Sequence, residues 1–147
     1  MSSSIALEAT LARPRRSAGG ASRAPGERAD SDAALGSATP GWYVCAACAE
    51  RLAREDWALE AHPRGPLVFT NPHGRFFELL LVTHVLGGVF DRHATTEFSW
   101  FAGYAWRIGS CARCGAHIGW HFQATHEASL REFVALSRAA LKFSRSE

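Results

Sequence analysis

Short apolar runs separated by turn-forming residues dominate the C-terminal two thirds of the chain. The run 42–44 is rich in β-prone residues, and so is the run 67–70. The second is followed by N-P-H-G at 71–74, in which proline presets φ at the second turn position and glycine closes the turn. Another apolar run comes next, so we predict a β-hairpin over residues 67–83.

Residues 106–110 and 118–122 lie on either side of the second C-x-x-C sequence, and we predict strands that lead into it and out of it. Glycines at 87, 88 and 103 separate other short strands. Residues 50–62 have a mixed pattern with room for one helical turn. These features together predict a mainly β fold.

The pattern changes near the C-terminus, where apolar residues recur at helical spacing. They are Leu130, Phe133, Val134, Leu136, Ala140 and Leu141. Ser129, with Glu132 three residues later, forms a capping box of the kind that begins a helix. We therefore expect a C-terminal helix that packs on the sheet.

Residues 1–40 differ from the rest, because they are rich in Ala, Ser, Arg and Gly and contain no aromatic residue. Such a segment buries too little apolar surface to offset its ordering entropy. We expect a disordered tail over 1–40 and one domain over 41–144. The tail has a weak similarity to organellar transit peptides, which its acidic residues oppose, and no apolar core of a secretory signal. The expected location is the cytoplasm.

Composition excludes some classes of function. The net charge of +2 gives no basic footprint for nucleic acid, and we expect none to bind. No apolar run approaches the roughly 18 residues of a membrane-spanning helix, so no membrane partner is expected. The chain is expected to be a monomer.

All four cysteines fall in two C-x-x-C pairs, Cys45 with Cys48 and Cys111 with Cys114, and 62 residues separate the pairs. Four thiolates can form a closed tetrahedral Zn²⁺ site, with no open position for substrate. Two disulfides in an oxidising compartment, or redox chemistry of thioredoxin type, are the alternatives. The doubled motif favours structural zinc. His117 could replace one ligand, but four cysteines already suffice.

Three tryptophans lie within 21 residues around the second pair. Trp120 and Phe122 alternate along one strand and so face the same side. Trp100 and Trp106 flank a turn at 101–104 that can bring both indoles together. Core packing is one interpretation of these side chains. The other is a rigid aromatic pocket for a small flat ligand.

Several motifs occur together in one order. They are C-A-A-C at 45–48, N-P-H-G at 71–74, E-F-S-W-F-A-G-Y-A-W at 97–106, C-A-R-C-G-A-H-I-G-W-H-F at 111–122 and F-V-A-L-S-R-A-A-L at 133–141. Through them the chain resembles the cereblon thalidomide-binding (CULT) domain family, and most of all its small single-domain bacterial members. The resemblance covers about residues 42–143.

The resemblance implies a β-tent, in which two antiparallel sheets are pinned by a zinc site made of the four cysteines. It also implies a cage that binds cyclic imides: glutarimide and thalidomide-like compounds, succinimide, uracil-like rings, or a cyclic imide at a protein C-terminus. In the family, the ring N–H donates to the backbone carbonyl at the position of Phe98, and the backbone N–H at Trp100 donates to a ring carbonyl. The implied ligand-binding residues are Asn71, Phe98, Ser99, Trp100, Trp106, Trp120 and Phe122. Some members have histidine where this chain has Phe98, so one side-chain hydrogen bond is absent here.

Two rival functions belong to other classes. Methionine sulfoxide reductases share the β-tent and the doubled C-x-x-C, but they need a further cysteine, which this chain lacks. A reader of methylated ammonium would also use aromatic walls, usually with a carboxylate, and Glu97 is the nearest candidate. Full-length family members carry further domains that serve a ubiquitin ligase. We expect this chain to be a binding module and not an enzyme.

Overall fold

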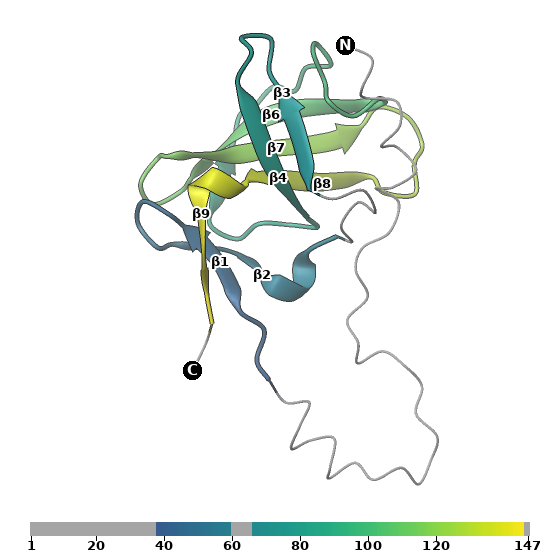
Figure 1. Ribbon diagram of the computed structural model, residues 1–147. Coiled ribbons are helices and arrows are strands. Elements are labelled where there is room, and N and C mark those ends of the chain that lie inside the picture. Colours follow the sequence, from purple (N-terminus) through teal and green to yellow (C-terminus); the bar gives the residue numbers. More distant parts are fainter. Residues whose placement is uncertain (1–37, 60–65, 146–147) are drawn as a thin grey trace, which may run out of the picture.

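The computed structural model describes residues 38–59 and 66–145 (Figure 1). The strands of this part are β1 (Trp42–Cys45), β2 (Arg51–Arg54), β3 (Leu67–Thr70), β4 (Phe76–Val82), β5 (Gly88–Phe90), β6 (Tyr104–Cys111), β7 (His117–Ala124), β8 (Glu132–Ser137) and β9 (Leu141–Ser144). Two short 3-10 helices, η3 (Glu55–Trp57) and η4 (Arg138–Ala140), complete it. The tail expected over 1–40 lies outside the described residues except for its last three. No helix in 38–59 or 66–145 has the length and apolarity needed to cross a bilayer.

The strands form two antiparallel sheets, as predicted. The small sheet has the order β2-β1-β9, and the large sheet has the order β3-β4-β8-β7-β6-β5. Figure 1 shows the small sheet, with the blue β1 and β2 and the yellow β9, below the large one. Among the described residues, the first two strands and the last strand therefore form one sheet, and β3 to β8 form the other.

The predicted β-hairpin is present as β3 and β4, which pair from Leu67 with Leu79 to Thr70 with Phe76. Gly74 closes the turn with φ of 83°. The side-chain carbonyl of Asn71 accepts the backbone N–H groups of His73 at 3.0 Å and of Arg75 at 2.9 Å. These bonds hold the turn in one shape, because they satisfy turn amides that would otherwise need water.

The predicted C-terminal helix is wrong. The segment forms strand β8, then the single turn of η4, then strand β9. The five residues from Phe133 to Ser137 are all buried, because β8 lies between β4 and β7 with both faces covered. A strand buried on both faces has a continuous apolar sequence, and in a short run that pattern cannot be distinguished from the apolar face of a helix.

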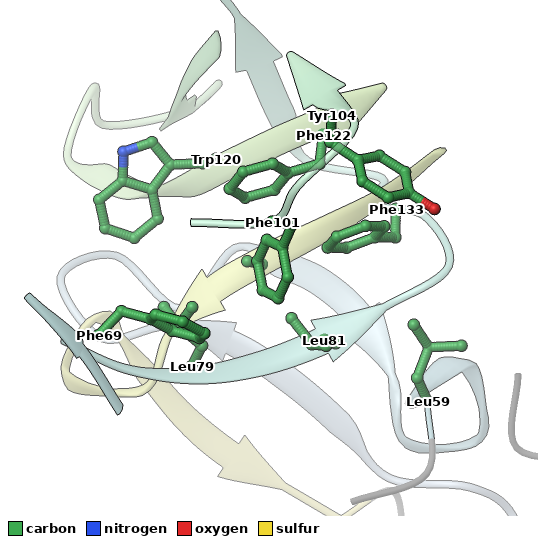
Figure 2. Close-up of a cluster of buried hydrophobic side chains, with 10 residues drawn as sticks. Leu59, Phe69, Leu79, Leu81, Phe101, Tyr104, Trp120, Phe122 and Phe133 are labelled. Carbon is green, nitrogen blue, oxygen red and sulfur yellow. The ribbon is translucent and has the colours of Figure 1, made fainter. Parts of the chain in front are cut away.

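Two apolar clusters, one on each face of β8, form the core. Phe133 and Ala135 belong to the first cluster, and Val134 and Leu136 belong to the second. Figure 2 shows the first cluster, in which Phe101, Phe122 and Phe133 lie together and the Trp120 indole lies at one end. The Phe101 ring packs edge-on to Phe122, with ring centroids 4.8 Å apart. The aromatic core therefore continues directly into the side chains predicted to line a pocket.

Candidate metal centre and aromatic pocket

The two C-x-x-C segments adopt matching turns. In the first, the Ala49 N–H donates to the Cys45 carbonyl at 2.8 Å, and the Cys45 N–H donates to the Glu50 carbonyl at 2.8 Å. In the second, Gly115 donates to Cys111 at 2.8 Å, and Cys111 donates to Ala116 at 2.7 Å. The residue that follows the second cysteine of each pair has a left-handed backbone conformation, with φ of 66° at Ala49 and 81° at Gly115. Each turn thereby directs both of its sulfur atoms to one side.

The four sulfur atoms meet where the two sheets come together. Cys45 ends β1 of the small sheet, and Cys111 ends β6 of the large sheet. All four Sγ atoms lie within 4.8 Å of one another. The Sγ atoms of Cys45 and Cys114 are 3.7 Å apart, and those of Cys48 and Cys111 are 3.5 Å apart. Sulfur atoms around a tetrahedral Zn²⁺ with 2.3 Å bonds are separated by about 3.8 Å, so the cluster fits this ion.

The thiol pKa values show that the four cysteines do not all lose their protons readily without a cation. Desolvation raises the pKa of the Cys48 thiol to about 12. At Cys111, burial raises the pKa, but the backbone N–H groups of Cys114 and Arg113 outweigh it and the pKa falls to about 7. Four thiolates this close would repel one another, so a divalent cation is needed to hold them all deprotonated.

A cavity of about 760 Å³ opens beside the aromatic core. Six of its lining residues are aromatic: Phe77, Phe98, Trp100, Trp106, Trp120 and Phe122. The others are Asn71, Pro72, His73, Ile108 and His117. The predicted site residues Asn71, Phe98, Trp100, Trp106, Trp120 and Phe122 all line it, and we call its three indoles and Phe122 the aromatic cage. Its size and its mainly apolar lining are typical of small-molecule sites.

Hydrogen bonds and edge contacts hold the indoles of the cage. The Trp100 Nε1–H donates to the Thr70 carbonyl at 3.0 Å, and the Trp106 Nε1–H donates to the Glu97 carbonyl at 2.7 Å. The Trp100 and Trp120 rings meet edge to face, with centroids 4.7 Å apart and planes at 73°. Walls fixed in this way lose little side-chain entropy when a ligand binds.

The loop before Trp100 has an unusual backbone. Phe98 has φ of 57°, a left-handed conformation that costs a bulky residue about 1–3 kcal/mol, and the residue is 71% exposed. The Ser99 N–H donates to the Thr96 carbonyl at 3.3 Å, and its Oγ donates to the Phe101 carbonyl at 3.0 Å. Ser99 therefore supports the loop and does not line the cavity. Within the described residues, neither the Phe98 carbonyl nor the Trp100 N–H has a hydrogen-bond partner.

His117 lines the pocket, although sequence analysis considered it only as a metal ligand. Its Nε2 lies 3.1 Å from the Gly119 carbonyl, which can only accept, so Nε2 carries the proton. Burial lowers the pKa of His117, the bond to Gly119 opposes this, and the charge of Arg75 lowers it further. The ring also meets Trp120 edge to face, with centroids 4.7 Å apart. His117 is therefore a neutral part of the pocket wall.

The metal centre and the pocket share two strands. Trp106 lies five residues before Cys111 on β6, while Trp120 and Phe122 lie on β7, which begins three residues after Cys114. The pairing of β6 and β7 shifts register between Gly109 and Ser110. Ile118 and Trp120 are two residues apart and would share a face in a regular strand. Because of the shift, Ile118 belongs to the second core cluster and Trp120 to the first. A cation at the cysteines thus holds the base of the two strands that carry most of the cage.

Comparisons with known proteins identify relatives of this chain. Cereblon of Gallus gallus is 43% identical over 79 residues, which are 52% of this chain and 18% of that protein. Cereblon of Xenopus tropicalis is 40% identical over 80 residues, or 53% of this chain and 18% of that protein. Cereblon of Danio rerio is 39% identical over 79 residues, again 52% and 18%. The chain therefore matches less than a fifth of the length of these curated relatives. No protein-family model matches it.

Proposed function

This chain contains a cereblon-like (CULT) domain, and from that premise we propose that its aromatic cage binds the ring of a cyclic imide. The candidate rings are glutarimide, succinimide, a uracil-like ring, or a cyclic imide at the C-terminus of a modified protein. The domain acts as a monomeric binding module and not as an enzyme. Zn²⁺ held by Cys45, Cys48, Cys111 and Cys114 has a structural role, because four thiolates leave no position for a reacting group.

The proposal rests on one observation: the apolar walls of the cage lie beside backbone groups that have no hydrogen-bond partner within the described residues. Within the described residues, the Phe98 carbonyl and the Trp100 N–H lack partners and are two residues apart along the loop. An imide offers an acceptor, a donor and an acceptor along one edge, and apolar CH2 groups along the opposite edge. The polar edge complements the loop, and the CH2 edge suits indole faces.

Selectivity follows from the same hydrogen bonds. A buried imide N–H or carbonyl without a partner costs about 1–3 kcal/mol. An N-methylated imide or a hydrocarbon ring of equal size can fill the cage, but the backbone groups of the loop then stay unsatisfied. We expect such analogues to bind at least tenfold more weakly than the free imide, because about 1.4 kcal/mol is a factor of ten.

The rival functions gain no support from the site. No residue that lines the pocket carries a carboxylate, and Glu97 contributes its backbone carbonyl to Trp106, so the cage lacks the anion that a reader of methylated ammonium usually has. All four cysteines of the sequence belong to the metal cluster, which leaves no thiol for sulfoxide reduction.

Isothermal titration of the zinc-loaded chain tests the proposal. The ligands are glutarimide, uracil, N-methylglutarimide and a trimethyllysine peptide. We expect glutarimide or uracil to bind, N-methylglutarimide to bind at least about tenfold more weakly, and the peptide not to bind. Trp120→Ala should abolish binding, while Trp42→Ala, which changes an indole outside the pocket, should retain it. Binding of the peptide but of no imide would replace the proposal with the methylated-ammonium function.

A further inference from the structure

Three nitrogen-bearing side chains lie along the β3–β4 turn, at one wall of the pocket. Asn71 and His73 line the cavity. Arg75 packs its guanidinium against the ring of Phe77, with 5.4 Å from Cζ to the ring centroid, and Phe77 is itself a lining residue. We call Asn71, His73 and Arg75 the donor rim.

The hydrogen bonds of the turn leave the rim with donors. The Oδ1 atom of Asn71 already accepts two backbone N–H groups, so its remaining polar group is the NH2, which only donates. A guanidinium has five N–H donors and no acceptor. Within the described residues, Arg75 has no ion-pair partner, and no hydrogen bond involves the ring of His73.

No acidic side chain balances this charge at the pocket. None of the lining residues is Asp or Glu. Glu78, on the same strand as Phe77, pairs instead with Arg138 at 3.4 Å. The charge of Arg75 also acts at the pocket wall, because it helps to lower the pKa of His117, after the larger effect of desolvation. The pocket is therefore electropositive on the side of the turn.

We propose that the ligand of this pocket is a cyclic imide whose exocyclic substituent ends in a carboxylate, and that Arg75, with His73 and Asn71, binds this group at the donor rim. The inference rests on the proposed imide function and specifies its ligand. Guanidinium and carboxylate groups form paired, charge-assisted hydrogen bonds. Because the rim is exposed, the gain in affinity is modest and falls with salt.

A matched pair of ligands tests the inference on the full zinc-loaded chain. The first is 3-acetamidoglutarimide, which is neutral, and the second is the same ring with a succinamoyl group, which ends in a carboxylate. At low salt we expect the carboxylate ligand to bind about three- to fivefold more tightly. In Arg75→Gln the ratio of the two affinities should fall to about one. Lys142→Gln, an equal change of charge on the exposed small-sheet strand β9, should keep the ratio.

The outcomes separate the two proposals. Equal affinity of the two ligands, or a preference that survives in Arg75→Gln, would overturn the anionic subsite while leaving imide binding intact. Failure of both ligands to bind would overturn imide binding, and the subsite with it. If the preference for the carboxylate ligand were lost equally in Lys142→Gln, it would reflect the net charge of the protein. That result would also refute specific binding of the carboxylate at the donor rim.

Discussion

The indole N–H of Trp100 donates to the backbone carbonyl of Thr70 across 3.0 Å, and this bond ties the cage to the β3–β4 hairpin. The two residues are 30 positions apart in the chain. The Trp100 ring also stacks on Phe69, the residue before Thr70, with centroids 5.4 Å apart. The wall formed by Trp100 is thus held by the β3–β4 hairpin, in which the sequence predicted only Asn71 as a site residue.

Removal of the Trp100–Thr70 hydrogen bond should make the side chain at position 100 less firmly held while an aromatic ring still lines the cage. Trp100→Phe keeps an aromatic ring but leaves the Thr70 carbonyl without its donor. We expect the free energy of unfolding to fall by about 1–2 kcal/mol and imide affinity to fall about tenfold. Chemical denaturation and titration calorimetry measure these two effects. Trp57→Phe, a matched change outside the pocket, should leave the affinity unaltered; an equal loss there would refute the role of this bond.

Loss of one metal ligand should unfold the domain. Cys111→Ser removes a sulfur from a residue that is 2% exposed and lies at the junction of the two sheets. Structural zinc sites contribute about 10–16 kcal/mol of binding free energy in small zinc-dependent folds, which exceeds the stability of most domains. Zinc content and circular dichroism should both be lost. Ser110→Ala, next to the ligand, is the control, and a Cys111→Ser protein that melts like the wild type without zinc contradicts a structural metal.

Gly119 should tolerate no side chain. A Cβ there would meet the carbonyl of Ala135 and the Cα of Leu136, because β7 and β8 approach closely at this point. Gly119→Ala must therefore separate two central strands, and we expect a loss of more than about 2 kcal/mol, as for other overpacked cores. Gly103→Ala provides the comparison: its φ is 85° and nothing lies within 4 Å of the added Cβ, so only the backbone cost of about 1–2 kcal/mol applies. Equal losses of unfolding free energy in Gly119→Ala and Gly103→Ala would show that the close approach of β7 and β8 at Gly119 does not limit the side chain there.

The neutral state of His117 should appear in the pH dependence of stability. The pKa of His117 is lower in the folded chain than its usual value of 6.5, so the unfolded chain binds the proton more readily. The contribution of neutral His117 to the free energy of unfolding is therefore fully present above pH 6.5. It decreases as the pH falls toward the lower pKa of the folded state. Urea denaturation between about pH 7.5 and 6 should show a smaller decrease for His117→Gln than for the wild type. An identical decrease in both proteins would mean that another group titrates.

The features that depend on local pattern could be predicted from the sequence. The hairpin over 67–83, the strands beside the second cysteine pair and the two sheets joined at the cysteine cluster are all present. The shared orientation of Trp120 and Phe122 also follows from strand alternation, and both belong to one core cluster. Each of these predictions needed only the period of a strand or the spacing of a motif.

The features that depend on tertiary pairing could not be predicted. The expected helix at the C-terminus is strand β8, which pairs with β4 and β7 at its two edges and has an apolar cluster on each face. Phe77 lines the pocket only because the β3–β4 hairpin lies beside the cage. His117 lies next to the cysteines in sequence, which suggested a metal ligand, but its hydrogen bond to Gly119 holds it in the pocket wall. No local signal in the sequence reports these contacts.

The central claim is that the cage encloses an imide ring, and nuclear magnetic resonance of the isotope-labelled, zinc-loaded chain tests it most directly. On titration with glutarimide, we predict that the Trp120 indole N–H and the Trp100 backbone N–H shift together with one dissociation constant. The indole signals of Trp42 and Trp57, which pack against each other outside the pocket, should stay in place. Shifts confined to Trp42 and Trp57, or no shift at millimolar glutarimide, would contradict the account.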